Sequence, residues 1–398
     1  MRSFDNFYIL FFEAIYILVS VAAIKGLKNI LKNKIRNYLI RTFIIITLLL
    51  ALAFPILYLS NNLTSTSAEY KYYIVFNLLF FTDFLSKLPV AAAYAISLII
   101  KKQKQIILWI GTIPSIALSI TLITGALSGI SQIDVKRIAI EFNNLPQRFD
   151  NYRIVHISDI HLGSFIGNNR VIDKTVKEIT QLSPNIILFT GDLVNNFAYE
   201  TEEWIARFKK LSNNYKCFSI LGNHDYGNYS QWENIAEKED NFRGIIEAHS
   251  QFGFSILRNE NTNIVLNGDT ISLIGVENWG HPPFPQYADL KSAMREVPDN
   301  RFKILLTHDP AHWATKVKEH EKIDLTLSGH SHGLQWGIKP AGLPFSVSYW
   351  VRKNWGGLYK SGDNYLYVNT GLGIVGMPWR IDMPAEITLI TLKRSKID

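Results

Sequence analysis

Four long apolar segments occupy the chain before about residue 130. Each is about long enough to cross the ~30 Å hydrocarbon layer of a bilayer as a helix that rises ~1.5 Å per residue. A cleaved signal peptide would account for one such segment but not for four. The pattern predicts a transmembrane domain over residues 1–130, with helices at about 7–24, 42–59, 72–100 and 106–127.

The charges between these segments predict their orientation. Loop 25–41 carries six Lys and Arg residues and no acid, and loop 101–105 carries three Lys, whereas loop 60–71 has one Lys and one Glu. Short cytoplasmic loops of membrane proteins are enriched in Lys and Arg. The first and third loops are therefore predicted to be cytoplasmic. Everything after about residue 130 is then expected on the outer, periplasmic face of the cell (inner) membrane.

Two opposite charges interrupt the third apolar segment. Asp83 and Lys87 are four residues apart, so they share one face of a helix and can pair. Charged groups inside a membrane are costly and are often functional. A pair that only fixes helix packing explains the same pattern equally well, and Glu13 in the first segment leaves the same two alternatives.

From about residue 131 the pattern changes to short apolar runs separated by polar stretches with helical apolar spacing. Continuous apolar runs of this length predict strands that are covered on both faces, and the alternation with helices predicts an α/β fold. Five of these runs end in Asp, Asn or His: RIVHISDIH (153–161), NIILFTGDL (185–193), KCFSILGNHD (216–225), FKILLTHD (302–309) and IDLTLSGHSH (323–332).

Composition changes the picture in two respects. The chain has 398 residues, a net charge of +7 and a pI near 9.1, but the basic residues concentrate in the loops between apolar segments, which favours a membrane protein, and no nucleic-acid partner is expected. Cys217 is the only cysteine, which excludes an internal disulfide and a cysteine-based zinc site.

The polar residues at the ends of the predicted strands are candidates for a metal site. Such strand ends are where α/β folds build their sites. A single Asp in this position is more often a helix cap than a ligand, but five strand ends in succession are hard to explain by capping. Glycines before Asp192, Asn223 and His330 would let the backbone turn sharply there. The candidates are Asp159, His161, Asp192, Asn223, His308, His330 and His332.

This series of motifs resembles the signature of the calcineurin-like metallophosphoesterases, in particular their membrane-associated bacterial branch. The matching residues are Asp159-Ile-His161, Gly191-Asp192, Gly222-Asn-His-Asp225, His308 and Gly329-His-Ser-His332, and the resemblance covers roughly residues 150–398. It implies a four-layer sandwich for residues 131–398, with two central mixed β-sheets flanked by helices.

The resemblance also implies a binuclear metal site and a role for each residue. Asp159, His161 and His332 would hold one metal ion, while Asn223, His308 and His330 would hold the other. Asp192 would bridge the two ions, which from the ligand types would be Mn, Fe or Zn. The catalytic residues would be His224, which polarises the phosphate or protonates the leaving group, and Asp225, which orients the His224 ring.

The second motif departs from the family pattern GDxxD, because Asn195 occupies its last position. This puts hydrogen bonding around the metal ligands in doubt, but not metal binding. Outside the motifs, His281 and Arg380 are weaker candidates for a substrate pocket, and a plain loop histidine is the commoner explanation for the former.

The expected function is a membrane-anchored, metal-dependent phosphoric ester hydrolase acting on a phosphodiester, a pyrophosphate or a phosphomonoester, with lipid-linked substrates favoured by the membrane anchor. Two alternatives remain open. One is a non-catalytic metal-binding sensor or interaction module on the same fold, and the other is a lipid-precursor pyrophosphatase that faces the cytoplasm.

Overall fold

A computed structural model describes residues 6–31, 33–59, 67–280, 285–318, 322–338, 345–346, 348–351 and 353–395. The chain divides into two compact units. One consists of Met1–Ser128 together with Met377–Ile381, and the other consists of Gly129–Gly376 together with Asp382–Asp398. Each unit has its own core and is described by itself.

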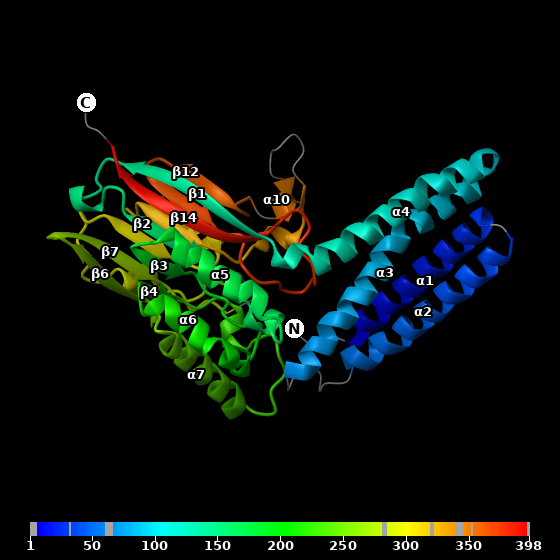
Figure 1. The fold of residues 1–398 in the computed structure, drawn as a ribbon, viewed down its shortest axis with the longest axis horizontal. Helices are drawn as coiled ribbons and strands as arrows, with labels where there is room; N and C mark the ends of the chain where they lie inside the picture. Colours follow the sequence, from blue (N-terminus) through cyan, green and yellow to red (C-terminus); the bar gives the residue numbers. More distant parts are fainter. Residues whose placement is uncertain are drawn as a thin grey trace. The chain divides into compact units, whose positions relative to one another are not determined.

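The first unit is a bundle of four helices: α1 (Asn6–Ile30), α2 (Asn33–Leu59), α3 (Ser67–Ile99) and α4 (Lys104–Leu127) (Figure 1). All four are long and apolar enough to cross a membrane. They extend beyond the apolar runs, since flanking residues such as Lys28 and Arg36 continue the helices. Many large apolar side chains point outward, among them Leu18 at 70% exposure and Leu49 at 63%, as expected of a surface that faces lipid. The predicted all-α transmembrane bundle is confirmed.

The interior of the bundle contains the predicted Asp83–Lys87 pair. The Lys87 ammonium group contacts the Asp83 carboxylate and also donates to Thr47 Oγ1 at 2.7 Å and Ser20 Oγ at 3.3 Å. The Tyr16 hydroxyl donates to Asp83 Oδ2 at 2.8 Å. An ammonium group has three N–H donors, and each has an acceptor here, so the pair links α1, α2 and α3. This arrangement favours the packing alternative for these two charges.

The first sheet of the second unit has six strands in the order β1-β14-β2-β3-β4-β5. β2, β3, β4 and β5 are parallel neighbours, and β14 runs antiparallel to β2 and parallel to β1. The strands are β1 (Ile133–Phe142), β2 (Arg153–Ile157), β3 (Ile186–Phe189), β4 (Lys216–Ser219), β5 (Ser255–Ile256) and β14 (Ala385–Arg394).

The second sheet has six strands in the order β12-β13-β9-β8-β7-β6. Its central strands β13, β9, β8 and β7 are parallel neighbours, whereas β6 and β12 are antiparallel edge strands. Asn267 and Gly268 both have positive φ in the β6–β7 turn, as a two-residue hairpin requires. The strands are β6 (Glu260–Leu266), β7 (Asp269–Gly275), β8 (Lys303–Leu306), β9 (Leu325–Ser328), β12 (Gly357–Ser361) and β13 (Asn364–Val368); β10 (Gly337–Ile338) and β11 (Phe345–Ser346) form a separate short pair.

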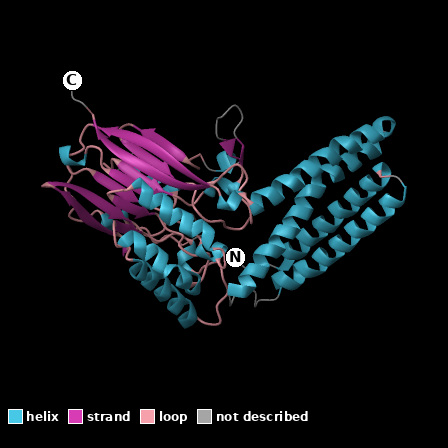
Figure 2. Cartoon of the chain, in the orientation of Figure 1, coloured by secondary structure: helices cyan, strands magenta, loops and turns pink. Residues whose placement is uncertain are grey.

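Helices lie beside the strands of this unit (Figure 2). They cover the outer faces of both sheets, and an apolar core lies between the sheets. Helices α5 (Asn169–Leu182), α6 (Ile205–Ser212) and α7 (Ile235–Phe252) lie side by side over the first sheet (Figure 1). The second sheet is covered by α8 (Leu290–Ala293) and by α9 (Pro310–His312), which continues into a π-helical turn; α10 (Ser348–Val351) follows β11. The predicted four-layer sandwich is confirmed.

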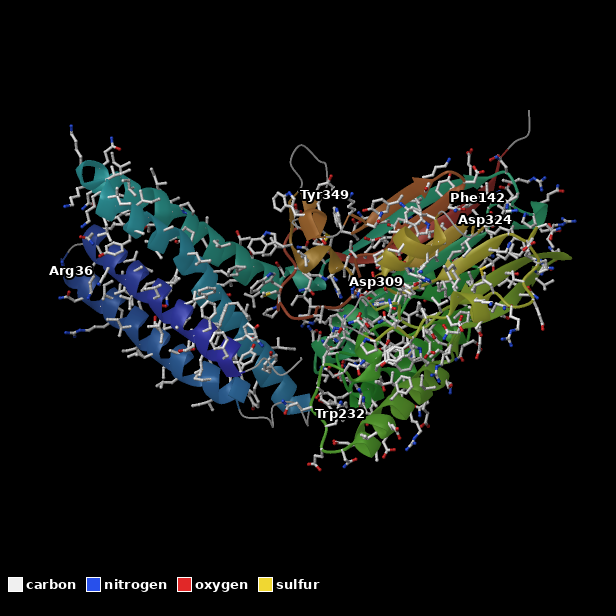
Figure 3. The ribbon with its side chains drawn as sticks, turned by 180° about the vertical axis from the view of Figure 1, so that it is seen from behind. Arg36, Phe142, Trp232, Asp309, Asp324 and Tyr349 are labelled. Carbon is white, nitrogen blue, oxygen red and sulfur yellow. The ribbon has the colours of Figure 1, made fainter. Side chains whose placement is uncertain are left out.

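The parallel strands bring the candidate residues to one edge of the sandwich. Asp309 follows β8 and Asp324 precedes β9, and the two lie at opposite ends of the second sheet (Figure 3). All the polar strand ends of interest lie on the side of Asp309, because the strands that carry them are parallel within each sheet.

Candidate metal centre

Every candidate ligand follows directly on the carboxyl end of a central strand. In the first sheet, the segments after β2, β3 and β4 carry four of them, and in the second sheet the segments after β8 and β9 carry the other three. The structure brings all seven together: Asp159, His161, Asp192, Asn223, His308, His330 and His332.

The first group of ligand atoms comes from Asp159, His161 and His332, which lie within 4.8 Å of one another and are all buried. His161 Nε2 is 3.1 Å from His332 Nε2, and His332 Nε2 is 3.2 Å from Asp159 Oδ1. These three residues come from both sheets, since His332 follows β9.

The second group comes from Asp192, His308 and His330, again within 4.8 Å of one another. His308 Nε2 lies 3.2 Å from Asp192 Oδ2, 3.2 Å from His330 Nδ1 and 3.1 Å from Asn223 Oδ1. Asp192 also faces the first group, because its Oδ2 is 3.5 Å from His161 Nε2. Asp192 therefore stands between the two groups.

Hydrogen bonds outside the groups fix the tautomers of two of the histidines. His161 Nδ1 is 3.1 Å from the carbonyl oxygen of Val194, and His308 Nδ1 is 2.7 Å from that of Thr190. A carbonyl only accepts, so each Nδ1 carries a proton and each Nε2 faces the site, where it can bind a metal ion in place of a proton. Ring nitrogens and carboxylate oxygens thus face one another at about 3 Å. That donor set fits metal cations, and imidazole with carboxylate suits the transition metals.

The backbone at the site is held in an uncommon conformation. Asp159, His161, Asp192, His330 and His332 all have positive φ, between 47° and 70°. Non-glycine residues seldom adopt this left-handed region, and such strain clusters at functional sites. Five of the seven candidate ligands share it.

The glycines of the motifs have two different roles. Gly191 has a φ of +91°, so it provides the expected sharp turn. Gly222 and Gly329 instead leave room: a Cβ atom on Gly222 would lie 2.2 Å from Asp192 Oδ1, and one on Gly329 would lie 2.2 Å from Asp159 Oδ2. At those two positions, close approach of the carboxylates requires glycine.

The carboxylates and imidazoles strongly perturb one another. Burial by itself would raise the pKa of Asp159, but His332 and His308 hold it below its ordinary value. Burial lowers the pKa of His308, yet Asp192 and Asp159 more than offset this and raise it to about 10. Two buried carboxylates thus create a strongly negative environment that favours positive charge at this strand edge.

His224 stands beside the ligands, but its ring is not oriented by Asp225 as expected. His224 Nδ1 lies 2.7 Å from the backbone carbonyl oxygen of Asn195. The Asp225 carboxylate is fully buried and accepts backbone N–H bonds from Gly222 and Asp192, at 2.8 and 2.9 Å, and from Leu193. The Asp225 side chain thus points into the loop that follows β3 and not toward the His224 ring. The expectation that Asp225 orients this ring is corrected, because the Asn195 carbonyl occupies that place.

The departure at Asn195 has little consequence for His224, because the contact uses the backbone. The Asn195 side chain donates to Ser164 Oγ at 3.2 Å and to the Ile374 carbonyl. The side chain of Asn195 therefore takes no part in the contact with His224.

The sequence did not indicate two residues that lie near the site. Glu200 is buried and accepts backbone N–H bonds from Gly163, Asn195, Asn196 and Phe197. The Tyr229 hydroxyl lies 2.9 Å from Asn223 Nδ2. Neither belongs to a motif at the end of a strand, and no sequence pattern marks a carboxylate whose partners are backbone amides.

The two weaker candidates have different outcomes. His281 lies outside the described residues. Arg380 is 1% exposed and belongs to Met377–Ile381, which clusters with the helical bundle; its backbone N–H donates to the Gly125 carbonyl in α4.

The fold and the site define an α/β sandwich with two adjoining sets of metal-ligating side chains at its strand edge, and comparison with known proteins agrees. Residues 152–334 match the family of the calcineurin-like phosphoesterases. An uncharacterized metallophosphoesterase of Bacillus subtilis, YkuE, is 29% identical over 66% of this chain and 86% of its own length. The uncharacterized metallophosphoesterase Cj0846 of Campylobacter jejuni is 28% identical over 71% of this chain and 69% of its own.

A bovine protein described as a transmembrane protein with metallophosphoesterase domain is 27% identical over 70% of this chain and 62% of its own length. The solved structure of a phosphopantetheinyl hydrolase of Mycobacterium tuberculosis aligns with 50% of this chain and 92% of its own at a TM-score of 0.31 and 13% identity, too low a similarity to bear on function. Residues 152–334 thus match a domain of a hydrolase family that uses divalent metals, and four helices long and apolar enough to cross a membrane precede that domain in the sequence.

Proposed function

We propose that this chain is a membrane-anchored hydrolase of phosphoric esters that works with two metal ions. The observation that carries the proposal is the pair of adjoining ligand groups with Asp192 between them, in which ring nitrogens and carboxylate oxygens converge. Asp159, His161 and His332 would hold one ion, and Asn223, His308 and His330 the other, with Asp192 shared. A pair of such ions, when bound, supplies an activated water and neutralises charge on the phosphoryl oxygens.

The chain's own residues support proton transfer at this site. Because His224 Nδ1 donates to the Asn195 carbonyl, its Nε2 is left to exchange a proton with the ester oxygen that leaves. The His224 ring packs edge-on against His161 at 4.9 Å between centroids, next to the first ligand group. The backbone N–H of His224 donates to Asp192 Oδ1 at 2.8 Å, which ties the general acid to the shared ligand.

The substrate class follows from the membrane anchor. Along the sequence, β1 begins at Ile133, a few residues after α4 ends at Leu127. So short a link between a helix able to span a membrane and the catalytic domain supports a substrate held in the same membrane, such as a phosphodiester or a pyrophosphate attached to a lipid. The site chemistry itself accepts soluble esters as well.

We propose further that the domain faces outward, because the basic loops 25–41 and 101–105 assign the first and third loops to the cytoplasm. A fusion of alkaline phosphatase or of green fluorescent protein after Asp398 tests this orientation. Phosphatase activity with no fluorescence is expected, and the opposite result would assign the domain to the cytoplasm.

The activity itself is tested with purified full-length protein in detergent. Metal content and hydrolysis of an aryl phosphodiester with and without added Mn²⁺ are measured, followed by the same assay on phospholipids, nucleotide-linked lipids and lipid pyrophosphates. Asp192→Asn and His330→Ala should lose both bound metal and activity, whereas Asp173→Asn, an exposed carboxylate on α5, should keep both. Hydrolysis that persists in the two site variants would overturn the proposal.

A further inference from the structure

Tyr229 contacts two residues of the candidate site at once. Its hydroxyl lies 2.9 Å from Asn223 Nδ2, and its ring stacks on the His224 ring with centroids 4.5 Å apart and planes at 25°. It lies in the loop that follows the single helical turn His224–Tyr226, beyond the last motif residue.

In the contact with Asn223, the NH₂ end of the amide faces Tyr229 and the oxygen faces the ligands. An asparagine side chain offers an oxygen that can bind a metal ion and an NH₂ group that cannot. The Tyr229 hydroxyl accepts from the NH₂ end, and Asn223 Oδ1 accordingly lies 3.1 Å from His308 Nε2, within the second ligand group. With a hydrophobic residue at position 229, nothing in this contact would distinguish the two ends.

The contact with His224 fixes the plane of its ring. Tyr229 stacks on the ring, and His161 meets it edge-on at 4.9 Å with an interplanar angle of 89°. The bond from Nδ1 to the Asn195 carbonyl then sets the rotation within that plane. The ring is therefore held by contacts from three sides.

The loop that carries Tyr229 is itself anchored. Gly227 has a φ of +64°, and its carbonyl accepts a hydrogen bond from Trp232 Nε1 at 2.7 Å. Lys238 on α7 donates to Asn228 Oδ1. These bonds on either side of the turn hold Tyr229 in place without help from a ligand.

We propose that Tyr229 is a positioning residue that presents Asn223 Oδ1 to the second metal ion and holds the His224 ring in its working plane. This rests on the proposed function, because it assigns a role within that site. The Tyr229 hydroxyl then supports metal binding, and the Tyr229 ring supports proton transfer by His224.

The test uses full-length protein in detergent, titrated with Mn²⁺ after removal of metal by a chelator. Tyr229→Phe removes the hydroxyl and keeps the ring, so binding of one of the two Mn²⁺ ions should weaken by about 10–100-fold, the usual effect of losing the partner of a metal ligand. Tyr229→Leu removes both parts, so it should weaken Mn²⁺ binding equally and also lower kcat at saturating Mn²⁺ by about tenfold or more relative to Tyr229→Phe.

Tyr215→Phe is the matched control. Tyr215 is also half-buried, and its hydroxyl is 3.4 Å from the Thr180 carbonyl, but it precedes β4 rather than following it. Its removal should change neither Mn²⁺ affinity nor kcat. The thermal unfolding of the metal-free forms should be the same for Tyr229→Phe and for Tyr215→Phe.

Different results would contradict the proposed function and the role of Tyr229. If the wild type binds no Mn²⁺, the proposed function fails and the role of Tyr229 fails with it. If the wild type binds two Mn²⁺ ions and Tyr229→Phe binds them as tightly, only the role of Tyr229 is overturned. A raised KM with unchanged Mn²⁺ affinity in Tyr229→Phe would also overturn it, since the hydroxyl would then serve the substrate.

Discussion

The backbone carbonyl oxygen of Asn195 lies 2.7 Å from Nδ1 of His224 and holds the imidazole ring by its inner nitrogen. The N–H of the same peptide group, which is that of Asn196, donates to the buried Glu200 carboxylate at 2.9 Å. The peptide group between Asn195 and Asn196 is therefore hydrogen-bonded on both sides, and it connects the buried Glu200 carboxylate to the His224 ring. This relay involves no side chain of residue 195, which explains how asparagine can occupy a position where the family pattern has aspartate.

We expect His224→Ala to lower kcat for an aryl phosphodiester by about 10²–10⁴-fold, the usual contribution of general acid–base catalysis. Bound metal should be retained, because the backbone N–H of His224, and not its ring, bonds to Asp192. Steady-state kinetics and elemental analysis on the same preparation check this. Parallel loss of metal would show that the ring supports the ligands instead.

Glu200→Gln should destabilise the protein by about 1–3 kcal/mol and also lower turnover. The carboxylate accepts four backbone N–H bonds, whereas the NH₂ end of glutamine would face some of those donors with donors of its own. Urea unfolding followed by tryptophan fluorescence, together with kcat, measures both effects. Glu202→Gln is the control because Glu202 is exposed, and equal behaviour of the two variants would contradict the relay.

His249 should make the protein less stable in acid. Burial lowers the pKa of this residue to about 3 from an ordinary value of 6.5, and only its Nδ1 is bonded, to Ser219 Oγ at 2.9 Å. Between these two values the unfolded chain binds a proton that the folded chain does not, so stability falls as the pH drops below 6.5. The loss from this residue should reach about 2 kcal/mol at pH 5.

Urea unfolding of the wild type and of His249→Gln at pH 7 and pH 5 measures that contribution. Glutamine does not titrate, so the variant should gain stability relative to the wild type at pH 5, while all other titrating groups are shared. If the free energy of unfolding changed equally between pH 7 and pH 5 in the wild type and in His249→Gln, His249 would already carry a proton in the folded protein.

In the helical bundle, Lys87→Met should destabilise the protein by about 3–5 kcal/mol, because it leaves the Asp83 carboxylate buried with one hydroxyl partner, Tyr16. The double variant Asp83→Asn with Lys87→Met removes both charges and should recover much of this loss. Thermal unfolding in detergent compares the three proteins. A double variant less stable than Lys87→Met would indicate that Asp83 has a separate role.

The candidate ligands could be predicted from the sequence, but the residues that hold them could not. Asp192 and His330 follow strand patterns and are each preceded by glycine, and such patterns are local. Glu200 and Tyr229 act through partners that depend on how a loop folds back, Glu200 on Gly163 and Tyr229 on Asn223. The expected contact from Asp225 to His224 was wrong for the same reason, since neighbours in sequence need not face each other after a turn.

The sequence alone determined the four apolar helices, the alternating strands and helices, and the set of side chains at the strand ends, since hydropathy and strand length act over a few residues. Only the tertiary structure decided that Asp192 stands between two ligand groups, that Lys87 joins three helices, and which atom orients His224. These are distances between residues far apart in the chain. They depend on how the two sheets pack on each other and, separately, on how the four helices pack within their bundle.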